Sequence, residues 1–239
     1  MTKQDKPLYT YLHAHYRMII SSLLILMGIM ISLLLPDILL RNRIGLEIKA
    51  SWSPLLFTLS WIFLLIGIMI FLKKRTRMIL YGITVGFTNI IVILQDLFLD
   101  GQGEMSQVES LLTIFKIKDF TIHGDIIIGS IISLAIMGIT LVLLKKQEEY
   151  HMDRYQKIYS LLITIILVGF CKGTATTQLG PEMISKTEKK VDPNLFEKNT
   201  YLARQDITKT MKLSGVYEET YRSICEWLSK EYEKRNLEE

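Results

Sequence analysis

Residues 18–40 read MIISSLLILMGIMISLLLPDILL, an apolar block in which Asp37 is the one charged side chain. A helix needs roughly 17–25 apolar residues to cross the hydrocarbon core of a bilayer. Backbone amides inside lipid must be bonded within their own segment, so a block of this length predicts a spanning helix. Comparable blocks follow at residues 54–72, 78–98, 126–144 and 155–171. The sequence therefore predicts an all-α membrane protein with about five transmembrane helices.

The segments around these blocks divide the chain into four parts. We expect a cytoplasmic N-terminus, a five-helix bundle, a linker and an extracytoplasmic helical tail, at residues 1–17, 18–171, 172–193 and 194–239. The first block lacks a following small-residue cleavage site, which predicts an uncleaved helix. Pro36 is expected to kink or end that helix. Pro54 suits the first turn of the second.

Lysine and arginine residues predict the orientation in a plasma membrane. With the N-terminus in the cytoplasm, eleven basic residues fall on the cytoplasmic side: Lys3, Lys6, Arg17, Lys73, Lys74, Arg75, Arg77, Lys145, Lys146, Arg154 and Lys157. Five fall on the other side: Arg41, Arg43, Lys49, Lys116 and Lys118. Because basic residues concentrate in cytoplasmic loops, this orientation is favoured, and it places the tail outside.

The tail carries one apolar stripe at helical spacing. Its members recur at steps of three or four residues: Tyr217, Tyr221, Ile224, Leu228 and Tyr232. Such a stripe lies along one side of a helix and needs a surface to cover it. The membrane surface, the loops of the bundle and another domain are the alternatives.

Polar residues within or beside the apolar blocks are the candidate functional positions. Asp96, with Gln95 next to it, lies near the outer end of the third block, and Asp37 follows Pro36. An ionisable residue at membrane depth is a functional candidate. The alternative, which we favour, is an interfacial or structural role, so we expect Asp96→Asn to leave folding intact.

Gly82 and Gly86 form a small-xxx-small pair inside the third block. Small residues at this spacing let two helices approach closely. We expect packing inside the bundle, in preference to dimerisation. Cys171 and Cys225 fit no metal-binding spacing, and we expect them to stay unpaired, with one disulfide as the alternative.

Motifs of catalysis are missing from the sequence. It contains no P-loop, no G-x-S-x-G and no H-E-x-x-H. We therefore expect no catalytic residue, no metal and no cofactor. The net charge of +4 comes from residues that flank apolar blocks, so nucleic acid is not an expected partner. Membrane lipids, including anionic phospholipids, are expected partners.

Several stretches together resemble the N-terminal membrane region of the lipoteichoic acid synthase family of phosphoglycerol transferases. They are Trp52-Ser-Pro-Leu-Leu-Phe-Thr-Leu-Ser, Lys73-Lys74-Arg75, Phe87-Thr-Asn to Asp100 with Ser110-Leu-Leu-Thr, Asn194-Leu-Phe-Glu-Lys and Met211-Lys-Leu-Ser-Gly-Val-Tyr. The resemblance spans nearly the whole chain. It implies five membrane helices followed by a linker that leads, in that family, to a large sulfatase-like domain outside the cell.

This sequence departs from the family in two respects. It has Gln95 and Asp96 where relatives usually carry a basic residue near the outer end of the third helix. It also lacks the sulfatase-like domain, which in relatives holds a threonine nucleophile and a manganese ion, so no catalytic or metal-binding residue carries over.

The resemblance implies a non-catalytic membrane module of cell-envelope polymer assembly, as an anchor or accessory of glycerol phosphate transfer. Its partner would be a separate sulfatase-like or other envelope protein. One alternative is a membrane-anchored immunity or sensor protein that uses the tail as an interaction module. A small transporter is the weaker alternative, because four of the five blocks offer almost no polar residue at mid-depth.

Overall fold

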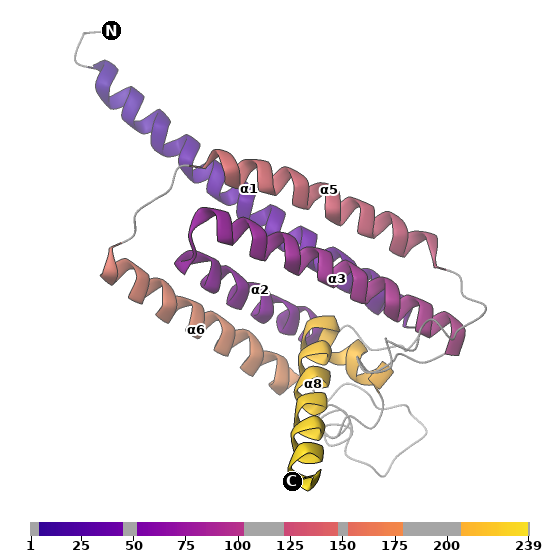
Figure 1. Cartoon of the computed structure of the whole chain (residues 1–239). Helices are drawn as coiled ribbons and strands as arrows, with labels where there is room; N and C mark the ends of the chain where they lie inside the picture. The colour runs from indigo at the N-terminus through magenta and orange to yellow at the C-terminus, as the bar shows by residue number, and fades with distance from the viewer. Residues whose placement is uncertain (1–4, 45–51, 103–121, 148–152, 179–206, 239) are drawn as a thin grey trace.

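The computed structural model describes residues 5–44, 52–102, 122–147, 153–178 and 207–238 (Figure 1). These residues form six α-helices: α1 Asp5–Arg43, α2 Ser53–Phe71, α3 Lys74–Gln102, α5 Gly124–Lys146, α6 Arg154–Gln178 and α8 Ile207–Glu238. Five are long and apolar enough to cross a membrane, over Ile19–Arg43, Ser53–Phe71, Lys74–Asp100, Gly124–Lys146 and Arg154–Thr177. The predicted class, an all-α protein with five membrane helices, is confirmed.

The first helix is longer than its apolar block. α1 begins at Asp5 and passes through Pro36 without ending. Proline has no N–H to donate to the carbonyl four residues earlier, which here belongs to Ser32. The Ser133 hydroxyl from α5 donates to that Ser32 carbonyl over 2.7 Å instead. A neighbouring helix therefore satisfies the group that Pro36 leaves open.

The linker prediction needs a correction at its start. α6 continues to Gln178 instead of ending at residue 171. Contacts with other helices hold this extension, because the Ser53 hydroxyl donates to the Ala175 carbonyl over 3.0 Å. The rest of the linker and residues 194–206 of the tail lie outside the described residues, and the helix found in the tail begins at Ile207.

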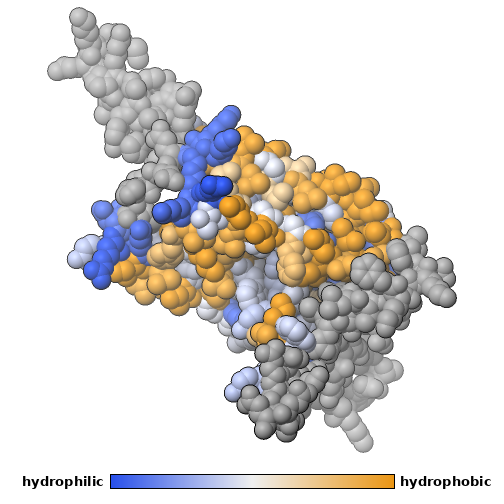
Figure 2. Space-filling model, in the orientation of Figure 1, coloured by the Kyte–Doolittle hydropathy of each residue, from blue (hydrophilic) through white to orange (hydrophobic). Residues whose placement is uncertain are grey.

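The spanning helices pack in two groups that lie side by side (Figure 1). α1, α3 and α5 pack together, and α2 packs on α6. Glycines allow close approach where Gly28 meets Thr140 of α5 and where Gly67 meets Thr164 of α6. Figure 2 shows apolar side chains over the flank of this bundle, with hydrophilic ones gathered at one end of it. α6 is the outermost span, with 11% of its apolar window buried.

The two ends of the bundle differ in what covers them. Lys74 and Arg77 lie at the end where α2 passes into α3, which we call the basic end. At the opposite end α1, α3 and α6 finish and α2 and α5 begin, and α8 packs there. We call it the α8 end. α8 leaves it beside the end of α6 and runs across the direction of the spanning helices (Figure 1).

Candidate functional site

Asp37 is the centre of the contacts that hold α8 on the bundle. Its carboxylate is fully buried and lies 2.8 Å from a guanidinium nitrogen of Arg41, one helical turn further along α1. The Thr58 hydroxyl of α2 donates to Asp37 Oδ2 over 2.7 Å. The backbone N–H of Val216 in α8 donates to Asp37 Oδ1 over 2.8 Å. One carboxylate thus joins three helices. α2 and α8 cover Asp37, so it is buried inside the protein. Its interfacial depth in the membrane stays a prediction.

A break in α8 at Gly215 makes this contact possible. Gly215 has φ +82° and ψ 170°, so the helix stops there and starts again at Val216. That conformation is open essentially to glycine alone. A Cβ at Gly215 would lie 2.9 Å from Thr58 Oγ1 and 3.0 Å from Asp37 Oδ1. The Asp37 carboxylate therefore sits where a new helix begins, and it accepts from one of the N–H groups that the helix leaves unpaired.

Residues on either side of Gly215 strengthen the attachment. The Lys212 ammonium donates to the carbonyls of Arg41 and Ile44, the latter over 2.9 Å, at the end of α1. Burial, with Arg41 nearby, lowers the pKa of Lys212. The Tyr217 hydroxyl donates to the Leu33 carbonyl inside the bundle over 2.9 Å. Removal of this hydroxyl from water raises the pKa of Tyr217 above its ordinary value of 10.

A second cluster joins α8 to α2 and α6. Glu218 Oε2 accepts a hydrogen bond from Trp61 Nε1 over 2.9 Å and lies 3.1 Å from the ammonium of Lys172. That ammonium is 5.4 Å from the centre of the Trp61 ring and 5.9 Å from that of Tyr221. The Trp61 and Tyr221 rings lie 4.9 Å apart. A cation, a carboxylate and two aromatic rings therefore fix the first turns of the second part of α8.

Asp96 forms a separate buried ion pair at the same end. Its Oδ1 lies 3.3 Å from Arg43 Nε, and its Oδ2 accepts from the His123 backbone N–H over 3.0 Å. The Arg43 guanidinium also lies within hydrogen-bond distance of the His123 ring. Asp96 is fully buried, and Gln95 is buried next to it. These contacts support a structural role, and an interfacial position stays a prediction. The paired charge revises our expectation for Asp96→Asn.

Polar side chains at mid-depth bond to one another across α1, α3 and α5. The Ser32 hydroxyl lies 2.8 Å from the Tyr81 hydroxyl. Asn89 donates to Ser133 Oγ over 3.0 Å, and Ser133 donates to the Ser32 carbonyl. Neutral groups that bond between helices in this way hold a membrane bundle together. This arrangement gives no specific support to a transport pathway.

Gly82 and Gly86 do not form a helix contact within the described chain. A Cβ added at either position would meet nothing within 4 Å. The predicted internal packing is therefore wrong for this pair. The reason is rotational: α3 turns the adjacent Tyr81 and Val85 toward its neighbours, and both are fully buried.

The apolar stripe of the tail is covered over part of its length. Tyr217 and Tyr221 contact the bundle, and Ile224 is half-buried. Leu228 and Tyr232 are 53% and 68% exposed. Cys225 on this part of α8 is exposed and Cys171 is buried, and both are free thiols, as expected.

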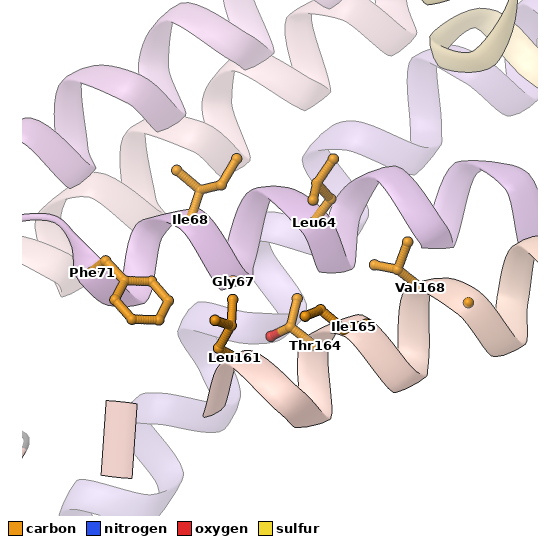
Figure 3. Close-up of a pocket in the computed structure, with 9 residues that line it drawn as sticks. Leu64, Gly67, Ile68, Phe71, Leu161, Thr164, Ile165 and Val168 are labelled. Atoms are coloured by element: carbon orange, nitrogen blue, oxygen red, sulfur yellow. The ribbon is translucent and has the colours of Figure 1, made fainter. Parts of the chain in front are cut away.

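A groove between α2 and α6 has a volume of about 340 Å³ (Figure 3). Its one polar side chain, Thr164, already donates to the Ser160 carbonyl over 2.8 Å. Nine residues line the groove: Leu64, Gly67, Ile68, Phe71, Leu161, Thr164, Ile165, Val168 and Gly169. A pocket that selects a polar ligand needs several convergent polar groups. This groove offers an apolar surface suited to a lipid chain.

The described residues therefore assemble an attachment site, built from buried ion pairs and helix contacts. Within those residues there is no group of three or more His, Cys, Asp and Glu side chains placed to hold a metal ion. Sequence reasoning missed Arg41, Thr58, Lys212 and Gly215. The spacing of Asp37 and Arg41, one turn apart in an apolar block, was the available signal for the first of them. Comparisons with protein-family models, curated proteins and solved structures find no match to this chain.

Proposed function

We propose that this chain is a non-catalytic membrane anchor that presents α8 in a fixed position for a separate envelope protein. The observation that carries the proposal is the Asp37 contact with Arg41, Thr58 and Val216. A buried charge is costly unless it is fully paired. Because this fold buries the charge of Asp37 in contacts that hold α8, it is suited to keeping α8 in a fixed position.

The exposed polar side of α8 next to the stripe is the surface that we assign to the partner. Ser229 lies on this side, about 100° around the helix from Leu228, and is exposed. The resemblance to lipoteichoic acid synthases supports a sulfatase-like transferase as the partner and glycerol phosphate polymers as the product. The excess of basic residues at the basic end supports a cytoplasmic N-terminus and an extracytoplasmic α8 in the plasma membrane.

Site-specific crosslinking in the native host tests this function. A benzophenone maleimide is attached at Ser229→Cys in a Cys225→Ser background, with Ile139→Cys on the exposed side of α5 as the matched control. We expect a crosslink to a sulfatase-like protein at position 229 alone. We also expect Asp37→Asn to abolish it, because α8 is then no longer held. Crosslinks to lipid alone, or an unchanged product with Asp37→Asn, would contradict the proposal.

An immunity or sensor protein anchored by the same bundle remains the second candidate. The attachment of α8 bears on it, because an independent interaction module needs no contact with the membrane helices. Here Val216 and Tyr217 bond to Asp37 and Leu33 of α1. This dependence on the bundle favours the anchor.

A further inference from the structure

We propose that the part of α8 from Tyr221 to Tyr232 lies in the lipid headgroup boundary beside α6, with Leu228 and Tyr232 inserted toward the acyl chains. This contact surface does not depend on the proposed protein partner, which would bind the adjacent polar side of the same helix. The proposal follows from the direction of the stripe, the position of α8 and the residues that the stripe contains.

The direction of the stripe is set by Tyr217. Its hydroxyl reaches the Leu33 carbonyl, ten residues before the end of α1 and thus about 15 Å along that helix. Tyr217 therefore points from the α8 end toward the interior of the membrane. Residues eleven and fifteen positions later on a continuous helix point the same way within about 60°. Leu228 and Tyr232 are those residues, and no break in α8 follows Gly215.

The position of α8 places lipid beneath these side chains. α8 crosses the end of α6, where Glu218 contacts Lys172, and continues past it (Figure 1). α6 is the outermost spanning helix, and several side chains along it, including Ile163 and Ile166, are more than half exposed. Beyond α6 the described chain offers no further span. A helix that continues outward from this point with its apolar side toward the membrane lies on lipid.

The composition of the segment suits the headgroup boundary. Trp227, Leu228 and Tyr232 are exposed apolar or aromatic side chains, and tryptophan and tyrosine concentrate at membrane–water interfaces. Residues 221–239 carry four basic and five acidic side chains, so this segment has no net positive charge with which to attract anionic lipid. Apolar insertion must therefore supply the contact, and zwitterionic lipid should serve as well as anionic lipid.

Spin-label accessibility in the full-length protein tests the proposal. Single labels are placed at Leu228→Cys and Ser229→Cys in a Cys225→Ser background, while the buried Cys171 is retained. Ile139→Cys is the lipid-exposed reference. Each protein is reconstituted in nanodiscs of phosphatidylcholine and in nanodiscs with one quarter phosphatidylglycerol. Collisions with oxygen, which concentrates in lipid, are compared with collisions with a water-soluble nickel chelate.

We expect the label at 228 to favour oxygen over nickel, as the label at 139 does, and the label at 229 to favour nickel. Both lipid mixtures should give the same ratio. A label at 228 that favours nickel would overturn the proposal, because the stripe would then face water. A label at 228 shielded from both reagents would also overturn it, because protein would then cover the stripe.

Discussion

Asp37 Oδ1 accepts a hydrogen bond from the Val216 backbone N–H over 2.8 Å, which joins the first spanning helix to a segment 179 residues later in the chain. The same carboxylate pairs with Arg41 and accepts from Thr58. Loss of this one side chain therefore affects three helices at once.

Asp37→Asn should release α8 and destabilise the protein. The substitution leaves the Arg41 guanidinium, which is 11% exposed, without its counter-charge. Breaking a buried ion pair from one side costs about 3–5 kcal/mol. Thr58→Val is the matched control, because it removes one hydrogen bond to the carboxylate and should cost about 1.5–3 kcal/mol. Thermal unfolding in nanodiscs measures both, and equal losses would argue against the ion pair.

Gly215→Ala should weaken the attachment of α8 through strain. The φ of +82° disfavours any Cβ, and this Cβ would lie within 3.0 Å of Thr58 and Asp37 oxygens. Strain of this kind costs about 1–3 kcal/mol before the contacts are counted. Gly82→Ala is the control, because its Cβ meets nothing within 4 Å and alanine favours a helix. A melting temperature lowered equally by both substitutions would contradict the account.

Asp96→Asn should destabilise the bundle less than Asp37→Asn does. Asp96 is fully buried, yet its partner Arg43 is 30% exposed and can regain water. An asparagine still accepts from the His123 N–H. We expect a loss of about 1.5–3 kcal/mol, the value of a single hydrogen bond to a charged group. If Asp96→Asn proved the more damaging substitution, the ranking of the two buried carboxylates would be wrong.

Alkaline pH should loosen α8. The pKa of Tyr217 is raised in the folded protein, so above pH 10 the folded state holds a proton that the released tail has lost. Stability is therefore complete below about pH 10 and falls as pH rises above it. Lys212, with its lowered pKa, contributes a change of the opposite sign. Tyr217→Phe removes the tyrosine contribution alone, so hydrogen exchange of α8 should accelerate less with pH in that variant. Identical pH profiles would contradict this role.

The five spans could be predicted from the sequence because composition and length decide them. The i to i+4 spacing of Asp37 and Arg41 was also visible in the sequence. Thr58 and Val216 were not predictable as partners, because they come from α2 and α8 and a single sequence holds no record of contacts at such separations. The same limit applies to Asp96, whose partners Arg43 and His123 lie 53 and 27 residues from it.

The glycines show a related limit. The spacing of Gly82 and Gly86 fits a helix contact, but the rotation of α3 decides whether the pair meets a neighbour, and that rotation follows from Tyr81 and Val85. Gly215 lies in a segment whose sequence pattern is helical. The break of the helix there is explained by the Asp37 carboxylate, which accepts a hydrogen bond from the backbone N–H of the next residue, Val216. The local sequence pattern predicted the helices, whereas the side that each helix turns toward its neighbours depends on tertiary packing.

Hydrogen exchange at the Val216 amide in nanodiscs tests the central claim, that Asp37 holds α8 on the bundle. We predict slow exchange over residues 213–218 in the wild-type protein and fast exchange there in Asp37→Asn, with the amides of α3 between Tyr81 and Val92 unchanged in both. Fast exchange over residues 213–218 in the wild-type protein, or slow exchange that Asp37→Asn leaves as it is, would contradict the account.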